Sequence, residues 1–188
     1  MPKYFAALTI VLVLTLVLTR LFSLKRQGIR AMKFGGEDKT DFLIPPFAFF
    51  YFYVVFANAF HWPAVSKQEF FHSPTVSWAG VVFCVAGILL LLWSIASFGQ
   101  SFRVGIDTDA PDKLVTSGAF AFSRNPIYVA FALVLTGQFL IFPNWICLVS
   151  IAAASWLFHR QVIREEKFLK RHYGQEFEDY CRRVRRYM

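Results

Sequence analysis

Apolar residues run along this chain in five long stretches that are separated by polar segments. A helix needs roughly 20 mostly apolar residues to cross about 30 Å of hydrocarbon. The pattern therefore predicts an all-α integral membrane helical bundle with about five transmembrane helices. The predicted spans are residues 4–22, 42–60, 76–98, 127–142 and 145–158, of which the last two are short and form a tight hairpin at Pro143 and Asn144.

The residues beyond the fifth span predict an amphipathic C-terminal helix on the cytosolic side. Apolar side chains recur there mostly every three or four positions, and Gly174 predicts a break. Glu165 occupies a position in the apolar stripe, three residues after Val162 and four before Leu169. A buried carboxylate is costly without a partner, so Glu165 requires donors, a cation or a ligand. An internal salt bridge, for instance to Arg124, is the alternative to a ligand site.

Composition supports the membrane assignment. Of the 188 residues, 56% are hydrophobic and 23 are Phe, and the mean hydropathy is +0.46. A soluble domain of this size would expose a large apolar surface. The first apolar run is longer than the apolar core of a signal peptide, and a basic cluster at 25–30 follows it in place of a cleavage site. We therefore expect a retained anchor.

The formal net charge of +8 is distributed unevenly. With the five spans above, all but Lys3 and Lys67 of the 20 Lys and Arg residues fall on one side of the membrane. The positive-inside rule then predicts a cytoplasmic C-terminus and an N-terminus on the outer side. We expect the basic tail to face the anionic lipid bilayer rather than nucleic acid. The three Cys and four His residues lack metal-ligand spacing, so no metal is predicted.

A polar, turn-rich segment at 113–128 leads into the fourth span and is the first candidate for chemistry. Polar groups at membrane depth are costly, and chains that keep them there commonly use them. Pro126 suits the first turn of the following helix, which makes Asn125 its N-cap. A helix cap and a ligand-binding amide are both consistent with Asn125.

Two ordered motifs lie in the C-terminal half. The first reads Leu-Val-Thr-Ser-Gly-Ala-Phe at 114–120, followed by Arg-Asn-Pro-Ile-Tyr at 124–128. The second follows the hairpin and reads Glu-Glu-Lys-Phe-Leu at 165–169, then Tyr-Gly-Gln-Glu-Phe-Glu-Asp-Tyr at 173–180. Together they resemble the isoprenylcysteine carboxyl methyltransferase and phospholipid methyltransferase superfamily. The resemblance covers about residues 99–187 and does not extend to the first two spans.

The chain shows no repeats or linkers, so we expect a single membrane domain, 1–188, with a three-span scaffold at 1–98 and a loop, helical hairpin and C-terminal helix at 99–188. The resemblance implies that this second part binds S-adenosyl-L-methionine on the cytoplasmic side. It implies transfer of a methyl group from this cofactor to a lipid-like or hydrophobic acceptor. Arg124 and Tyr128 would serve catalysis, and Arg160 and Arg164 would bind the substrate. The residues assigned to the cofactor are Gly105, Lys113, Leu114, Val115, Gly118, Phe120, Asn125, Pro126, Tyr128 and Glu165.

Three positions depart from the family's pattern. Asn125 stands where the family usually has His, and Phe120 where it has Tyr. Gln161 stands where the carboxyl methyltransferase branch has an Arg associated with the substrate carboxylate, with Arg160 and Arg164 nearby at other angular positions. The acceptor is therefore open between a carboxylate, such as that of an isoprenylcysteine, and a phospholipid amine.

Two other functions have to be separated from methyl transfer. A membrane reductase of the sterol type would have a similar helical C-terminal half but would use NADPH. A non-enzymatic membrane scaffold or transporter would bind neither cofactor, although the first three predicted spans contain no ionisable pathway and no paired repeats. A comparison of S-adenosylmethionine and NADPH binding distinguishes the three.

Overall fold

A computed structural model describes residues 1–26, 43–62, 69–98 and 114–188. The regular elements in these ranges are helical, and the only extended pairing among them is an isolated bridge between Glu69 and Asn144. The helices are α1 (Pro2–Arg26), α2 (Ile44–Ala59), α3 (Pro74–Phe98), the short 3-10 helix η3 (Gly118–Ala121), α4 (Pro126–Ile141), α5 (Trp145–Tyr173) and α6 (Gln175–Arg183). The predicted all-α fold is confirmed.

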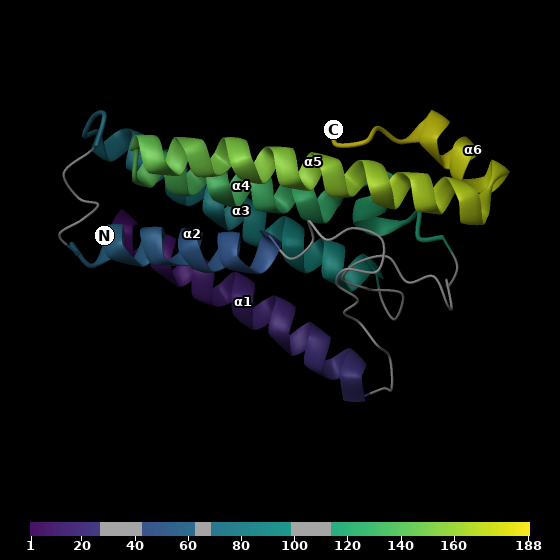
Figure 1. The fold of residues 1–188 in the computed structure, drawn as a ribbon, viewed down its shortest axis with the longest axis horizontal. Coiled ribbons are helices and arrows are strands. Elements are labelled where there is room, and N and C mark those ends of the chain that lie inside the picture. Colours follow the sequence, from purple (N-terminus) through teal and green to yellow (C-terminus); the bar gives the residue numbers. More distant parts are fainter. Residues whose placement is uncertain (27–42, 63–68, 99–113) are drawn as a thin grey trace.

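Helices α1 to α5 run roughly along the long axis of the molecule (Figure 1). The N-terminus, the end of α2 and the start of α5 lie at one end, and α6 lies at the other. α3 packs along α4, which in turn contacts α5, whereas α1 diverges from the bundle toward its C-terminal end. The chain after α6 turns back along α5, so the C-terminus lies beside the middle of that helix.

Three of the described helices, α1, α3 and α5, are long and apolar enough to cross a membrane. α2 and α4 are apolar but shorter, with 16 residues each. The chain is therefore an integral membrane protein. α5 continues without a break from Trp145 to Tyr173, so the predicted fifth span and the amphipathic segment beyond residue 158 form one helix. This continuity places the Glu165–Glu166 pair on the same rigid element as the membrane span.

Local sequence accounts for the ends of the helices that form the site. Pro126 occupies the first turn of α4, where a missing N–H costs nothing. The Asn144 side chain caps α5 by accepting a hydrogen bond of 2.9 Å from the Cys147 amide. α5 ends at Gly174, whose φ of +51° suits glycine, as the sequence predicted.

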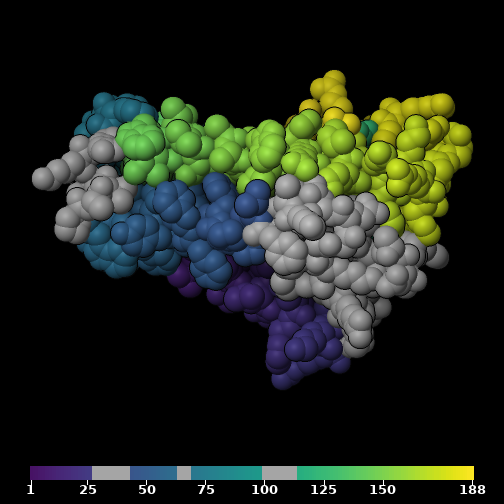
Figure 2. Space-filling view, in the orientation of Figure 1, coloured from purple at the N-terminus to yellow at the C-terminus, as the bar shows by residue number. Residues whose placement is uncertain are grey.

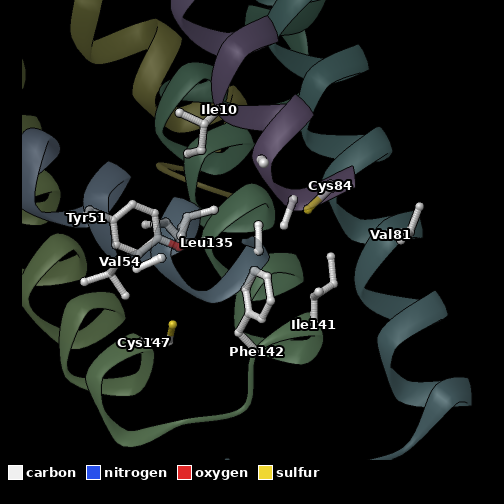
Figure 3. Packing of buried hydrophobic residues seen from close by; sticks show 14 of the residues in the cluster. Ile10, Tyr51, Val54, Val81, Cys84, Leu135, Ile141, Phe142 and Cys147 are labelled. Atoms are coloured by element: carbon white, nitrogen blue, oxygen red, sulfur yellow. The ribbon is translucent and has the colours of Figure 1, made fainter. Parts of the chain in front are cut away.

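A buried apolar cluster holds all five long helices, α1 to α5, together (Figure 3). Within it the Tyr51 hydroxyl donates to Gln138 Oε1 at 2.5 Å, and Gln138 Nε2 donates to the Ala6 carbonyl at 3.3 Å. Polar groups in hydrocarbon need such partners, so this chain of bonds fixes three helices relative to one another. α3 and α4 approach closely because Gly80 and Gly137 face each other. A Cβ on Gly80 would lie 2.5 Å from the Gly137 carbonyl oxygen.

Candidate functional site

The centre of the site is a contact between the start of α4 and the second half of α5. The Tyr128 hydroxyl donates to Glu165 Oε1 at 2.8 Å. The Gln161 side-chain amide, one turn earlier on α5, donates to the same oxygen at 3.0 Å. Glu165 is half-buried. The carboxylate thus faces α4 and has the hydrogen-bond donors that its place in the apolar stripe requires.

Aromatic and basic side chains extend this centre along α5. The Tyr128 ring lies 5.6 Å from the Phe158 ring, centroid to centroid. Arg164 donates to the side-chain oxygen of Gln161 at 3.3 Å, so one of the two predicted substrate-binding arginines reaches the centre through an intermediate amide. The other, Arg160, lies over the Trp156 ring at 5.6 Å.

A second cluster surrounds the neighbouring residue, Glu166, whose side chain is only 11% exposed. Arg124 donates through Nε and Nη2 to Glu166 Oε1, both at 3.1 Å. Arg186 donates to Oε2 through Nε at 3.0 Å and Nη2 at 2.9 Å. The hydrogen bond to Glu166 raises the pKa of Arg186, so this guanidinium stays charged at any physiological pH. Arg124 therefore pairs with Glu166, and the salt bridge considered between Arg124 and Glu165 does not form.

Asn125 belongs to the Glu166 cluster rather than to the Tyr128 centre. It stands at the N-cap position of α4, as predicted, but its side chain makes no cap hydrogen bond. The side-chain Nδ2 instead donates to Glu166 Oε1 at 3.3 Å and to the Arg186 carbonyl at 3.1 Å. The remaining donor of Arg124, Nη1, bonds the carbonyls of Cys181 and Val184, both at 3.2 Å. Both side chains are thus held by groups of the protein itself.

The segment before α4 is fixed to α3 and α6. Gly118 has a φ of +62°, and a Cβ there would collide with the Ser97 side chain on α3. Ser97 Oγ in turn accepts a hydrogen bond of 3.0 Å from the Ala119 amide. The Phe120 ring packs edge-on against Phe98 at 4.6 Å. A tight turn against α3 therefore requires glycine at position 118, one of the residues that the resemblance assigned to the cofactor.

The remaining predicted residues are placed as follows. Leu114 and Val115 are half-buried just ahead of η3, and Pro126 is buried at the start of α4. Gly105 and Lys113 lie outside the described residues, so their predicted roles stay predictions. The structure thus groups Tyr128 with Glu165 and Arg124 with Asn125, while Gly118 and Phe120 face α3.

An apolar groove of about 360 Å³ lies between the start of α2 and α5. Leu43, Pro46 and Phe47 line it from the α2 side, and Ala153, Trp156 and Leu157 line it from α5. Figure 2 shows α2 and α5 adjoining along this face of the molecule. Leu157 precedes Phe158, whose ring packs against Tyr128, so the groove and the polar centre are successive parts of one helix.

The model of the phospholipid methyltransferase family matches residues 75–176, more than half of the chain. The matched region includes α4, α5 and all but the first residue of α3, and therefore both glutamates and Tyr128. The chain belongs to the phospholipid methyltransferase family. The resemblance seen in its motifs is thereby confirmed.

Relatives that are named as methyltransferases match this chain over part of its length. The "Probable protein-S-isoprenylcysteine O-methyltransferase" of Oryza sativa subsp. indica is 28% identical over 112 residues, 58% of this chain and 59% of the relative. The rat protein-S-isoprenylcysteine O-methyltransferase is 32% identical over 126 residues, 65% of this chain and 43% of the relative. The chain thus spans about half the length of the curated relatives that it matches.

A solved structure supports the fold of this phospholipid methyltransferase family member. The structure of the eukaryotic intramembrane Ras methyltransferase, isoprenylcysteine carboxyl methyltransferase, aligns with a TM-score of 0.61 and 21% identity. The alignment covers 88% of this chain and 58% of that one. Because it extends beyond the family match, the arrangement of the helices is shared more widely than the motifs.

The roles of Gln161, Tyr180 and Arg186 were not predictable from the sequence. Arg186 lies in a run of basic residues that the positive-inside rule already explains, so nothing in the pattern distinguishes it. Tyr180 was recognised only as part of a motif, and its hydroxyl donates to the Phe120 carbonyl at 2.7 Å. Burial raises the pKa of Tyr180 well above its usual value, so the hydroxyl keeps its proton.

Replacing Tyr180 by Phe should destabilise the fold, because the buried Phe120 carbonyl loses its donor from α6. We expect a loss of about 1–3 kcal/mol in the free energy of unfolding. Thermal unfolding of the purified protein in detergent, followed by circular dichroism, measures this loss. The control is Tyr4→Phe, at a residue that is 56% exposed. Equal melting temperatures for the two variants would contradict a structural role of the Tyr180 hydroxyl.

Proposed function

We propose that this protein is a membrane methyltransferase that transfers a methyl group from S-adenosyl-L-methionine to a lipid-like or hydrophobic acceptor. The observation that carries the proposal is the Tyr128–Glu165 contact of 2.8 Å, at the point where the apolar part of α5 gives way to its polar part. The family match includes both partners. Relatives whose names state O-methyl transfer support the reaction class.

The side chains of the site suit this cofactor. S-adenosylmethionine supplies the methyl group on a sulfonium, which is a good leaving group, and it also carries an ammonium, a carboxylate and an adenosine. The half-buried Glu165 carboxylate would bind a cationic or hydroxyl-bearing part of the molecule. The rings of Tyr128 and Phe158 offer faces for cation–π contact with the positive end. Leu114 and Val115 would contribute backbone groups.

Methyl transfer requires the protein mainly to align the acceptor atom with the methyl group and to exclude water. The hydrogen bonds from Tyr128 and Gln161 hold one oxygen of Glu165 in place and thereby orient whatever this carboxylate binds. A carboxylate acceptor is already ionised and needs no base. An amine acceptor must lose a proton, which requires a base near it. Both acceptor classes remain open.

The apolar groove supports a lipid-like acceptor. On α5 the residues Ala153, Leu157, Gln161 and Glu165 follow one another at intervals of four and form one ridge of the helix. The first two line the groove and the last two form the polar centre. The rise from Leu157 to Glu165 is about 12 Å. An apolar chain in the groove would thus place a polar head group toward Glu165.

We further propose that the α6 end of the molecule faces the cytoplasm and the N-terminus lies outside. Arg26 ends α1 and Arg182 and Arg183 end α6, whereas the opposite end of the described bundle carries Lys3. Positive charge accumulates on cytoplasmic sides. The water-soluble cofactor would then reach the site from the cytoplasm and the acceptor from the bilayer. Membership of a methyltransferase family favours this function over an NADPH-dependent reductase.

The direct test is incubation of the purified protein with S-adenosylmethionine labelled in its methyl group and a lipid extract. We expect label to appear in a lipid fraction, and chromatography of that fraction distinguishes methyl esters from methylated amines. Binding of NADPH but not of S-adenosylmethionine would overturn the proposal in favour of the reductase, and binding of neither would favour a non-enzymatic protein.

Glu165→Gln should weaken S-adenosylmethionine binding while the protein stays folded, because the amide loses the charge but keeps the shape of the side chain. We expect roughly a 100-fold loss of affinity in calorimetric titration, as for the removal of a charged hydrogen bond. The control is Glu178→Gln, which removes a carboxylate that is 39% exposed and pairs with Lys170. A lower melting temperature with unchanged affinity would show that Glu165 serves only the fold.

Ala153→Phe should fill the apolar groove and reduce the turnover of long-chain acceptors. The matched control is Ala152→Phe, the same change at the adjacent and exposed position of α5. We expect a fall in kcat/KM for the acceptor of roughly tenfold or more at Ala153 only, with unchanged affinity for S-adenosylmethionine. Equal activities of the two variants would mean that the acceptor does not use this groove.

A further inference from the structure

The cluster around Glu166 joins three parts of the chain that are distant in sequence. Arg124 and Asn125 come from the loop before α4, Glu166 from α5, and Arg186 from the C-terminal strap, by which we mean residues 184–187. Two guanidinium groups compensate one carboxylate that is 11% exposed. A carboxylate so buried and so surrounded is a structural junction, since its charge is already balanced within the protein.

The backbone of the strap is attached to the same loop. The Arg124 amide donates to the Arg185 carbonyl at 3.0 Å. The Ser123 hydroxyl and the Asn125 side chain both donate to the Arg186 carbonyl, at 3.3 and 3.1 Å. The next residue, Tyr187, forms a hydrogen bond of 2.8 Å with His159 Nδ1 on α5. The strap is therefore held on both sides, by the loop before α4 and by α5.

This junction leads directly to the Tyr128–Glu165 contact. The Asn125 carbonyl accepts from the amides of Tyr128 and Val129, at 3.1 and 3.2 Å, and so forms the first turn of α4. Its side chain is bound to Glu166. Any shift of Asn125 would therefore move the turn that carries Tyr128 relative to α5, on which both glutamates lie.

We propose that Glu166 is a positioning residue that fastens the C-terminal strap to the start of α4 and thereby fixes Tyr128 against Glu165. The inference rests on the proposed function for its effect on the methyl donor, but the fastening itself does not. Consecutive residues on a helix point about 100° apart. The two glutamates therefore have different roles. Glu165 faces the proposed site of S-adenosylmethionine, and Glu166 binds the strap.

Two measurements on Glu166→Gln test this proposal. Backbone hydrogen exchange without any ligand should accelerate by roughly tenfold in 123–129 and 184–187 and stay unchanged in α3. The KM for S-adenosylmethionine should rise by roughly tenfold, while kcat with saturating donor stays within about threefold. Glu178→Gln, which removes another ion-paired carboxylate, should change neither quantity. Unchanged exchange in both segments would overturn the proposal.

A double-mutant cycle with Arg186→Gln separates positioning from direct binding. If Glu166 acts through the strap, the second substitution should cost little once the first is present, so the two increases in KM should not multiply. Fully multiplicative effects, or loss of donor binding without faster exchange, would show that Glu166 contacts the donor and would overturn the proposal. If the wild-type protein binds no S-adenosylmethionine, the proposed function fails, and hydrogen exchange in the two variants still decides whether Glu166 fastens the strap.

Discussion

Two consecutive carboxylates stand where α5 passes from apolar to polar surroundings, and neither can be buried there as an ion without compensation. Each carboxylate has its own set of partners, because neighbouring residues on a helix point about 100° apart. Glu166 meets Arg124 and Arg186. Glu165 meets a phenol and an amide, Tyr128 and Gln161. The rest of the site follows from this difference. Glu166 belongs to an ionic junction, and one oxygen of Glu165 accepts hydrogen bonds from Tyr128 and Gln161.

Because α5 is continuous, both glutamates keep a fixed position relative to the apolar groove. A single helix of 29 residues carries the wall of the apolar groove, the aromatic Phe158 and both glutamates. A break at the end of the membrane span would leave these groups on separate elements, free to shift. A continuous helix fixes the distance between the groove and the polar centre. Methyl transfer mainly requires that the two reactants be aligned, and a rigid helix that holds both binding regions at a fixed distance provides this alignment.

The fold was largely predictable because the length of an apolar stretch is a strong signal of a membrane-spanning helix. The five apolar stretches and the break at Gly174 followed from the spacing of apolar residues, whereas the contact of Glu165 with the start of α4 did not. One boundary was not predicted: α5 continues past residue 158 because nothing in 158–173 stops a helix.

The partners of the polar side chains were much harder to predict. Arg124 was considered as a catalytic residue or as the partner of Glu165, and the structure pairs it with Glu166. Asn125 has the position of a helix cap, but its side chain joins the C-terminal strap. Such choices depend on where residues 180–187 return in space, which no local pattern encodes. The same holds for Gly118, whose neighbour Ser97 lies 21 positions earlier in the chain.

The most direct test of the division between the two glutamates is an experimental structure of the protein with S-adenosylhomocysteine, the product of methyl donation. This account predicts that the bound molecule contacts Glu165 and Tyr128 and that the Arg186–Glu166 ion pair remains intact beside it. A molecule bound to Glu166 with Arg186 displaced, or one bound away from both glutamates, would contradict the account.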